Sequence, residues 1–155
     1  MKQANANRKR ILIVEDEPAI SKVCVRTLSA EGFQVEVAVN GKSALDVLKK
    51  KECDLCLIDI RTPLMNGIEL YQHLEEKHPA MVNKVIFTTG DVLSGNIRAF
   101  LEEANRPFLP KPFTPDELRA IVRTVLGLNQ DTTRQVTSSG ADRERCVEHV
   151  GIQTW

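Results

Sequence analysis

Three acidic residues and one lysine stand directly after apolar runs in this sequence, and they are the side chains best placed to do chemistry. Glu15 and Asp16 follow one run, Asp59 ends a second, and Lys111 follows a third. A buried carboxylate is costly unless a positive charge or a hydrogen-bond donor accompanies it. Acids at the ends of two separate apolar runs therefore indicate a functional site.

Strand-like and helix-like stretches alternate five times between residues 9 and 127. Compact β-branched or alternating runs predict strands, and apolar residues at helical spacing predict helices. The predicted strands are 10–14, 33–38, 55–58, 84–88 and 108–109, and each is followed by a helix, the third at about 67–77 and the last beginning with a capping box at 114–117. This alternation predicts an α/β fold whose parallel sheet is covered on both faces.

The predicted fold brings the chemically able residues to one edge of the sheet. In a parallel sheet the carboxyl ends of the strands lie together, and ligands bind there. Glu15, Asp16 and Asp59 would meet at that edge with Lys111 and a threonine hydroxyl. Clustered carboxylates repel one another, and Mg²⁺ relieves that repulsion. A lysine and a hydroxyl suit a phosphoryl group, so Asp59 is a candidate nucleophile that would form an aspartyl phosphate.

Four separated motifs carry a resemblance to a known family. They are residues 11–18, then 57–59 with Pro63 and Gly67, then 89–90, and finally 111–113. The sequence resembles the receiver domain of two-component response regulators, of the stand-alone chemotaxis type, over about 120 residues. The resemblance implies a flavodoxin-like, doubly wound sheet of five parallel strands in the order 2-1-3-4-5, with five helices.

The resemblance also implies roles for individual residues. Asp59 would be the phosphoacceptor that takes a phosphoryl group from a sensor histidine kinase or a histidine phosphotransfer protein. Mg²⁺ would be held by Glu15, Asp16, Asp59 and the backbone carbonyl of Arg61. Lys111 would pair with a phosphoryl oxygen, and its peptide bond to the following proline is expected to be cis. The protein would be a regulatory phosphoacceptor in a phosphorelay, not an enzyme.

A conformational switch and a control on dephosphorylation are expected beside the phosphoacceptor. Thr89, with Thr88 as the alternative, would bond the phosphoryl group, and Phe108 would turn inward behind it. The face made by the fourth helix, fifth strand and fifth helix would then change shape for an unknown output protein or for a homodimer. Arg61 and Asp91 would pair across the pocket and slow the loss of phosphate.

Composition and segment boundaries set further expectations. The formal net charge is zero, which argues against direct DNA binding. No apolar run approaches the ~20 residues of a membrane span, so a cytoplasmic protein is expected. We expect a flexible arm over 1–8, a receiver domain over 9–127, and a polar tail over 128–155 that is disordered or forms a short helix. No output domain is expected after residue 127.

Two other readings of the sequence remain open. The receiver fold could serve only as a dimerisation or scaffold module. A phosphatase of the haloacid-dehalogenase type also uses an aspartate nucleophile, but it needs a second aspartate where this chain has Arg61. Cys53 and Cys56 form a C-x-x-C, yet in an extended strand they would lie about 10 Å apart, too far for a disulfide. They are therefore predicted to be structural.

Overall fold

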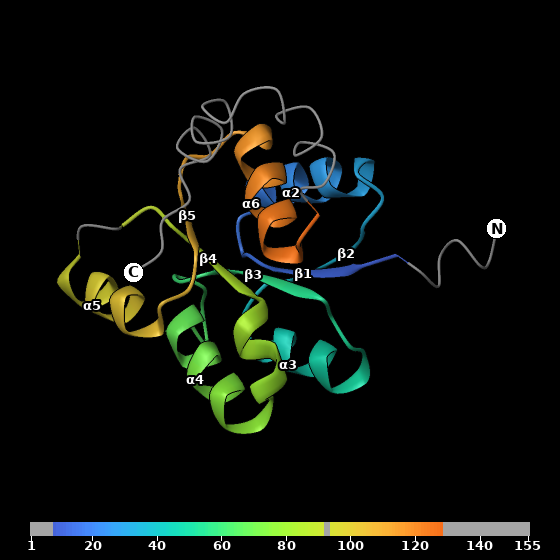
Figure 1. Cartoon of the computed structure of the whole chain (residues 1–155). Helices are drawn as coiled ribbons and strands as arrows, with labels where there is room; N and C mark the ends of the chain where they lie inside the picture. Colours follow the sequence, from blue (N-terminus) through green and yellow to red (C-terminus); the bar gives the residue numbers. More distant parts are fainter. Residues whose placement is uncertain (1–7, 92–93, 129–155) are drawn as a thin grey trace.

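Five parallel strands form one sheet in the order β2-β1-β3-β4-β5 in the computed structural model, which describes residues 8–91 and 94–128 (Figure 1). The strands are β1 (Arg10–Val14), β2 (Gln34–Ala38), β3 (Leu55–Asp59), β4 (Val85–Thr89) and β5 (Phe108–Pro110). The predicted flavodoxin-like fold and strand order are confirmed. The predicted N-terminal arm and C-terminal tail lie, except for one residue each, outside the described residues.

Helices cover both faces of this sheet. They are α2 (Pro18–Ala30), α3 (Gly41–Lys50), α4 (Gly67–Lys77), α5 (Gly95–Ala104) and α6 (Pro115–Leu126), with a 3₁₀ helix η1 (Pro79–Lys84) leading into β4. Helices α2 and α6 pack on one face, and α3 and α4 lie on the other (Figure 1). Five α-helices were predicted and five occur in the described segments, where no helix is long and apolar enough to cross a membrane.

Alternation along the strands divides the core into two layers. Ile58 and Phe87 face the layer under α3, α4 and α5, whereas Leu57 and Ile86 face the layer under α2 and α6. Every residue of β3 and of β4 is buried, as expected for central strands of a sheet covered on both sides. Asp59 ends β3, so the same packing that forms the core also buries its carboxylate.

Side-chain caps begin three of the helices. Asn40 accepts the backbone N–H of Ser43, and Thr114 forms the predicted capping box with Glu117. A second capping box, between Asn66 and Glu69, begins α4 directly after the loop that follows β3. These caps fix the points at which the loops of the carboxyl edge enter the helices.

The cysteines of the described segments are free and buried. Cys24, Cys53 and Cys56 form no disulfide, and Cys146 lies outside the described residues. Burial raises the pKa of the Cys24 thiol to about 12 and also raises the pKa of Cys53 and Cys56. The thiols therefore stay protonated and unreactive, as a structural role requires.

Gly67 closes the loop that follows Asp59. Its N–H donates to the carbonyl of Ile60 at 2.9 Å, so the chain turns back on itself within seven residues. A Cβ on Gly67 would lie 2.7 Å from the Ile60 Cα and 2.8 Å from the Asp59 carbonyl oxygen. Both neighbours are backbone atoms, which cannot move without shifting Asp59.

We predict that Gly67→Ala destabilises the protein, because the added methyl group has no space. The expected loss is about 2 kcal/mol or more in the free energy of unfolding. Gly95→Ala is the matched control, since a Cβ there meets nothing within 4 Å and lies in the first turn of α5. Urea unfolding measures both variants; equal stability of the two would contradict the prediction.

Candidate functional site

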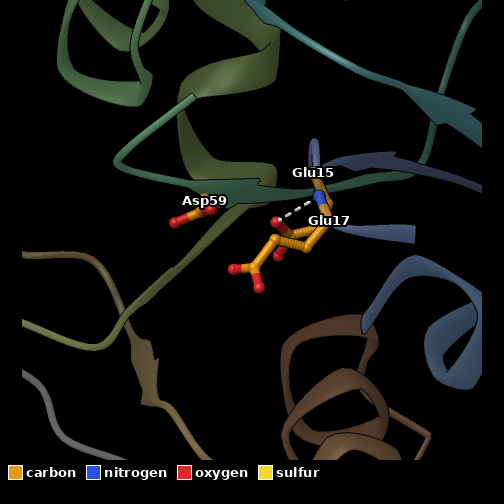
Figure 2. A group of neighbouring side chains, drawn as sticks. All are labelled: Glu15, Glu17 and Asp59. Atoms are coloured by element: carbon orange, nitrogen blue, oxygen red, sulfur yellow. Dashed lines mark hydrogen bonds between the residues drawn. The ribbon is translucent and has the colours of Figure 1, made fainter. Parts of the chain in front are cut away.

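The predicted site residues converge at the carboxyl edge of the sheet. Glu15 follows β1, Asp59 ends β3, and Lys111 follows β5. Figure 2 shows the carboxylates of Glu15 and Asp59 near that of Glu17 at this edge. Glu15 is 3% exposed and Asp59 4% exposed, so two acids are withdrawn from water within one small region. The prediction that these sequence-distant groups meet is confirmed.

The Lys111 ammonium lies between the acids. Its Nζ is 2.8 Å from Oε1 of Glu15, 3.1 Å from Oδ2 of Asp59 and 3.7 Å from Oε1 of Glu17. The Lys111 N–H donates to the carbonyl of Thr89 at 2.9 Å, and the Lys111–Pro112 peptide bond is cis, as expected. One cation therefore serves three carboxylates, and the group carries a formal excess of two negative charges.

Burial and the neighbouring charges shift the pKa values of Glu15 and Lys111. Burial, together with the charge of Asp59, raises the pKa of Glu15 from 4.5 to about 7, although bonds from Lys111 and the Glu17 N–H act in the opposite direction. Burial by itself would lower the pKa of Lys111, but the hydrogen bond to Glu15 and the charge of Asp59 raise it. Lys111 therefore stays charged, and Glu15 is the group most easily neutralised.

The acid set fits a divalent cation. One carboxylate oxygen each from Glu15, Glu17 and Asp59 lies within 4.8 Å of the others. Hard oxygen ligands and an excess of negative charge suit Mg²⁺, which keeps several waters in its shell. Sequence reasoning named Asp16 in this set and missed Glu17. The run of three acids at 15–17 was the available signal, but side-chain direction decides which of them face Asp59.

Asp16 lies elsewhere on the same edge. Its side chain is exposed and borders a hollow of about 490 Å³, which Ile60, Arg61 and Pro63 also line. The hollow lies beside Asp59 between the loop after β3 and the start of α5, where Ser94 borders it. Asp16 therefore borders the hollow and is not a member of the acidic cluster.

The threonines at the end of β4 differ in their partners. Thr88 is directly opposite Asp59 in the register of β3 and β4, and its carbonyl accepts the N–H of Ile60 at 3.0 Å. Thr89 is one residue further, and its hydroxyl accepts the N–H of Asp91 at 3.1 Å. Both threonines are buried. The Thr89 hydroxyl thus already bonds the loop that it is predicted to move.

Arg61 and Asp91 form an ion pair across the site. The Arg61 guanidinium contacts the Asp91 carboxylate, which joins the loop after β3 to the loop after β4. The Arg61 N–H also donates to Oδ1 of Asp59 at 3.2 Å. The pairing expected from the sequence is therefore present, next to the predicted nucleophile.

Phe108 is already inside the protein. It is 2% exposed and packs in the layer that contains Phe87. The sequence predicted an inward turn of this side chain on activation. The ring of Phe108 already packs in the apolar layer under α5, so in this conformation it has no outward position from which to turn.

A family comparison accounts for this arrangement. The model of the response regulator receiver domain matches residues 11–123, which is most of the chain. The chain belongs to the response regulator receiver family. It is 34% identical over 135 residues to the DNA-binding response regulator MtrA of Mycolicibacterium smegmatis, covering 86% of this chain and 57% of that protein. The receiver chain thus spans little more than half the length of this relative.

Solved receiver structures have the same fold. A CheY-like receiver domain protein from Methanospirillum hungatei JF-1 is 31% identical, with a TM-score of 0.71 over 81% of this chain and 99% of the other. The receiver domain of the sensor histidine kinase PA1611 from Pseudomonas aeruginosa PAO1 is 26% identical, with a TM-score of 0.69 over 77% and 98%. That structure has a magnesium ion coordinated in its active site cleft.

The prediction that excluded direct DNA binding is wrong. MtrA, which carries the same kind of receiver, is a DNA-binding response regulator. The exclusion rested on a formal net charge of zero over 155 residues and on the expectation of no output domain after residue 127. Net charge averages over all the residues counted, and it does not describe the parts of a regulator that such a count leaves out.

We predict that Glu15→Gln makes the stability of the metal-free receiver less dependent on pH. The folded state holds the Glu15 proton more tightly than the unfolded chain does. The contribution of Glu15 to the stability of the fold is therefore full below a pH of 4.5 and is lost as the pH rises through about 7. The free energy of unfolding of the variant, relative to that of wild type, should rise by about 2 kcal/mol between about pH 5 and about pH 8.

Chemical denaturation with EDTA present measures this gain. Glu52→Gln is the control, because Glu52 is exposed. If the gain in the free energy of unfolding of Glu15→Gln were no larger near pH 8 than near pH 5, the pKa of Glu15 would not be raised in the folded state.

Proposed function

We propose that the chain is a phosphoacceptor in two-component signalling and that Asp59 receives the phosphoryl group. The observation that carries this proposal is the contact between Lys111 Nζ and Oδ2 of Asp59 at 3.1 Å inside an acidic cluster. Each acid alone would be costly in a buried position. Together they form a site for a cation and for the charge of a phosphoryl group, which membership of the receiver family supports.

The proposed reaction is transfer from a phosphohistidine. A carboxylate oxygen of Asp59 attacks phosphorus in line, an O–P bond forms, and the P–N bond to the imidazole breaks. The electron pair of that bond stays on the imidazole nitrogen, which takes a proton from solvent. The phosphoryl group leaves the histidine as Asp59 becomes an aspartyl phosphate, so charge and atoms balance.

Mg²⁺ is the proposed cofactor. Asp59 and Glu15, with exposed Asp16 at the margin and the Arg61 carbonyl, are the proposed ligands, and the position of Glu17 supports adding it to this set. When bound, the ion would neutralise charge on the phosphoryl oxygens. A magnesium ion in the cleft of the PA1611 receiver supports the same choice.

Lys111 and Thr89 are proposed to hold the phosphoryl group. Lys111 Nζ already lies 3.1 Å from Oδ2 of Asp59, and the raised pKa of Lys111 keeps it charged. The Thr89 hydroxyl would exchange its bond with the Asp91 N–H for one to a phosphoryl oxygen. Because Asp91 is in the loop before α5, this exchange would shift that loop toward Asp59.

The proposed output is a change of shape at the face of α5, β5 and α6. Phe108 packs inside this face, so phosphorylation would stabilise the inward position that it already has. Such a change is a shift in population between two states of the face. A homodimer or an output protein would read it, while a histidine kinase or phosphotransfer protein would supply phosphate. We place the reaction in the cytoplasm.

The scaffold reading has less support. A module used only for association has no need of Glu15 and Asp59 in nearly full burial, or of a lysine between them. The phosphatase reading has less still, because the position of its second aspartate is held by Arg61, which is paired with Asp91. Phosphoacceptor chemistry uses every charged group of the site.

We predict that acetyl phosphate labels the protein in the presence of Mg²⁺ and that Asp59→Asn abolishes the labelling. The amide cannot attack phosphorus, so incorporation should fall to background. Asp46→Asn is the matched control, because Asp46 is an exposed aspartate on α3, away from the site. Radiolabel incorporation measures both. Labelling of Asp59→Asn at the wild-type level would exclude Asp59 as the acceptor.

We predict that Arg61→Ala speeds the loss of phosphate severalfold. The Arg61–Asp91 pair bridges the two loops beside Asp59 and would restrict the approach of the hydrolytic water. Removal of the guanidinium opens that path. The time course of dephosphorylation measures the effect, with Arg98→Ala as control, since Arg98 pairs with Glu102 along α5. An unchanged or slower rate in Arg61→Ala would contradict this role.

A further inference from the structure

Leu64 is the most unusual exposed residue of the loop between β3 and α4. Its φ is +65°, and it is 76% exposed. The left-handed region suits glycine or asparagine, and a leucine there is unfavourable. Within the described segments Asn105 is the other non-glycine residue with positive φ, and it ends α5 by donating its N–H to Leu101. Leu64 ends no helix, and its exposed side chain gains no burial that would offset the unfavourable backbone conformation.

Hydrogen bonds hold Leu64 in this conformation. The hydroxyl of Thr62 donates to the Met65 carbonyl at 2.9 Å, and the N–H of Gly41 donates to the same oxygen at 3.0 Å. The Gly67 N–H closes the loop on Ile60. The side chain of Leu64 is therefore exposed on a loop whose backbone is fixed by hydrogen bonds. A fixed support lowers the entropy cost of binding, so the arrangement suits recognition.

The surroundings of Leu64 extend this apolar surface. Val39, two residues before Gly41, is 54% exposed in the loop that Gly41 joins to Met65. Pro63, next to Leu64, borders the hollow that also reaches Asp16. Two contacting loops of the carboxyl edge thus each expose a large apolar side chain, and one of them also borders the hollow beside Asp16 and Arg61.

A protein that phosphorylates Asp59 must cover this surface. Asp59 is 4% exposed, so a donor has to bring its reacting group down to the edge of the sheet. Leu64 is five positions after Asp59 in the chain, which limits their distance to about 17 Å. A standard interface covers about 800 Å² on each partner, a disc of roughly 16 Å radius. The loop turns back on Ile60 and is not extended, so the separation is shorter than this limit. A donor centred on Asp59 therefore reaches Leu64, whereas a small phosphodonor does not.

We propose that Leu64 is an apolar anchor for the protein that carries the donor phosphohistidine. The partner has an apolar patch beside its phosphorylated histidine, and Leu64 packs into that patch while the imidazole reaches Asp59. The inference rests on the proposed phosphoacceptor function and adds the residue that separates protein donors from small ones. Apolar anchors near the centre of an interface carry much of its binding energy.

The test compares two phosphodonors on the same variants. Leu64→Gly removes the side chain and suits the positive φ, and Leu64→Asn keeps a side chain that tolerates it. One donor is acetyl phosphate; the other is the autophosphorylated histidine kinase that labels wild type fastest in a purified panel. We expect Leu64→Gly and Leu64→Asn to lower kcat/KM for the kinase roughly tenfold and to leave acetyl phosphate labelling unchanged.

Two controls accompany these variants. Leu64→Met replaces leucine by another large apolar side chain and should keep most of the wild-type kinase rate. Leu128→Gly removes an exposed leucine that follows α6 at the opposite edge of the sheet, and it should change neither rate. Thermal unfolding of all variants checks that they are folded.

Each remaining outcome would overturn the inference. A kinase rate within twofold of wild type would show that the donor does not contact Leu64, and an equal fall with both donors would make Leu64 a positioning residue for Asp59. A wild-type dimer that Leu64→Gly dissociates, without a change in kinase rate, would assign the surface to a second copy of the chain. Labelling by acetyl phosphate but by no kinase would overturn the anchor and leave Asp59 as acceptor, whereas no labelling by either would overturn both.

Discussion

The burial of two carboxylates against one ammonium is the constraint on which the site depends. Glu15 and Asp59 are nearly inaccessible, and Lys111 is the cation that contacts both. Neither acid could be removed from water at this edge without that lysine. Burial, with the charge of Asp59, keeps the pKa of Glu15 high. The acids therefore carry more negative charge than Lys111 neutralises, which supports the proposed cation site.

The loop after β3 turns this electrostatic arrangement into a shaped surface. Gly67 brings the chain back to Ile60, and the Met65 carbonyl accepts bonds from Thr62 and Gly41. The backbone at Gly67 therefore packs against Asp59, while Leu64 in the same loop is exposed. The same hydrogen-bonded backbone positions Asp59, the proposed nucleophile, and sets what a protein donor would meet first.

Much of the site was predictable, and the misses have physical reasons. Strand ends marked Glu15, Asp59 and Lys111, because an acid or lysine directly after a buried strand has few structural explanations. Glu17 was missed since its place facing Asp59 depends on how α2 leaves β1. The exclusion of DNA binding failed because the charge of one segment does not report on the function of longer relatives.

The sequence by itself determined the alternation of strands and helices, the caps, and the identity of the charged groups at the carboxyl edge. These features depend on local periodicity and on residue type, which can be read along the chain. The tertiary structure alone decided that Lys111 is shared by three acids, that Glu17 and not Asp16 lies in the acidic cluster, and that Leu64 is exposed at a positive φ. Distances between separate loops depend on how helices pack on the sheet, and no spacing in the sequence contains them.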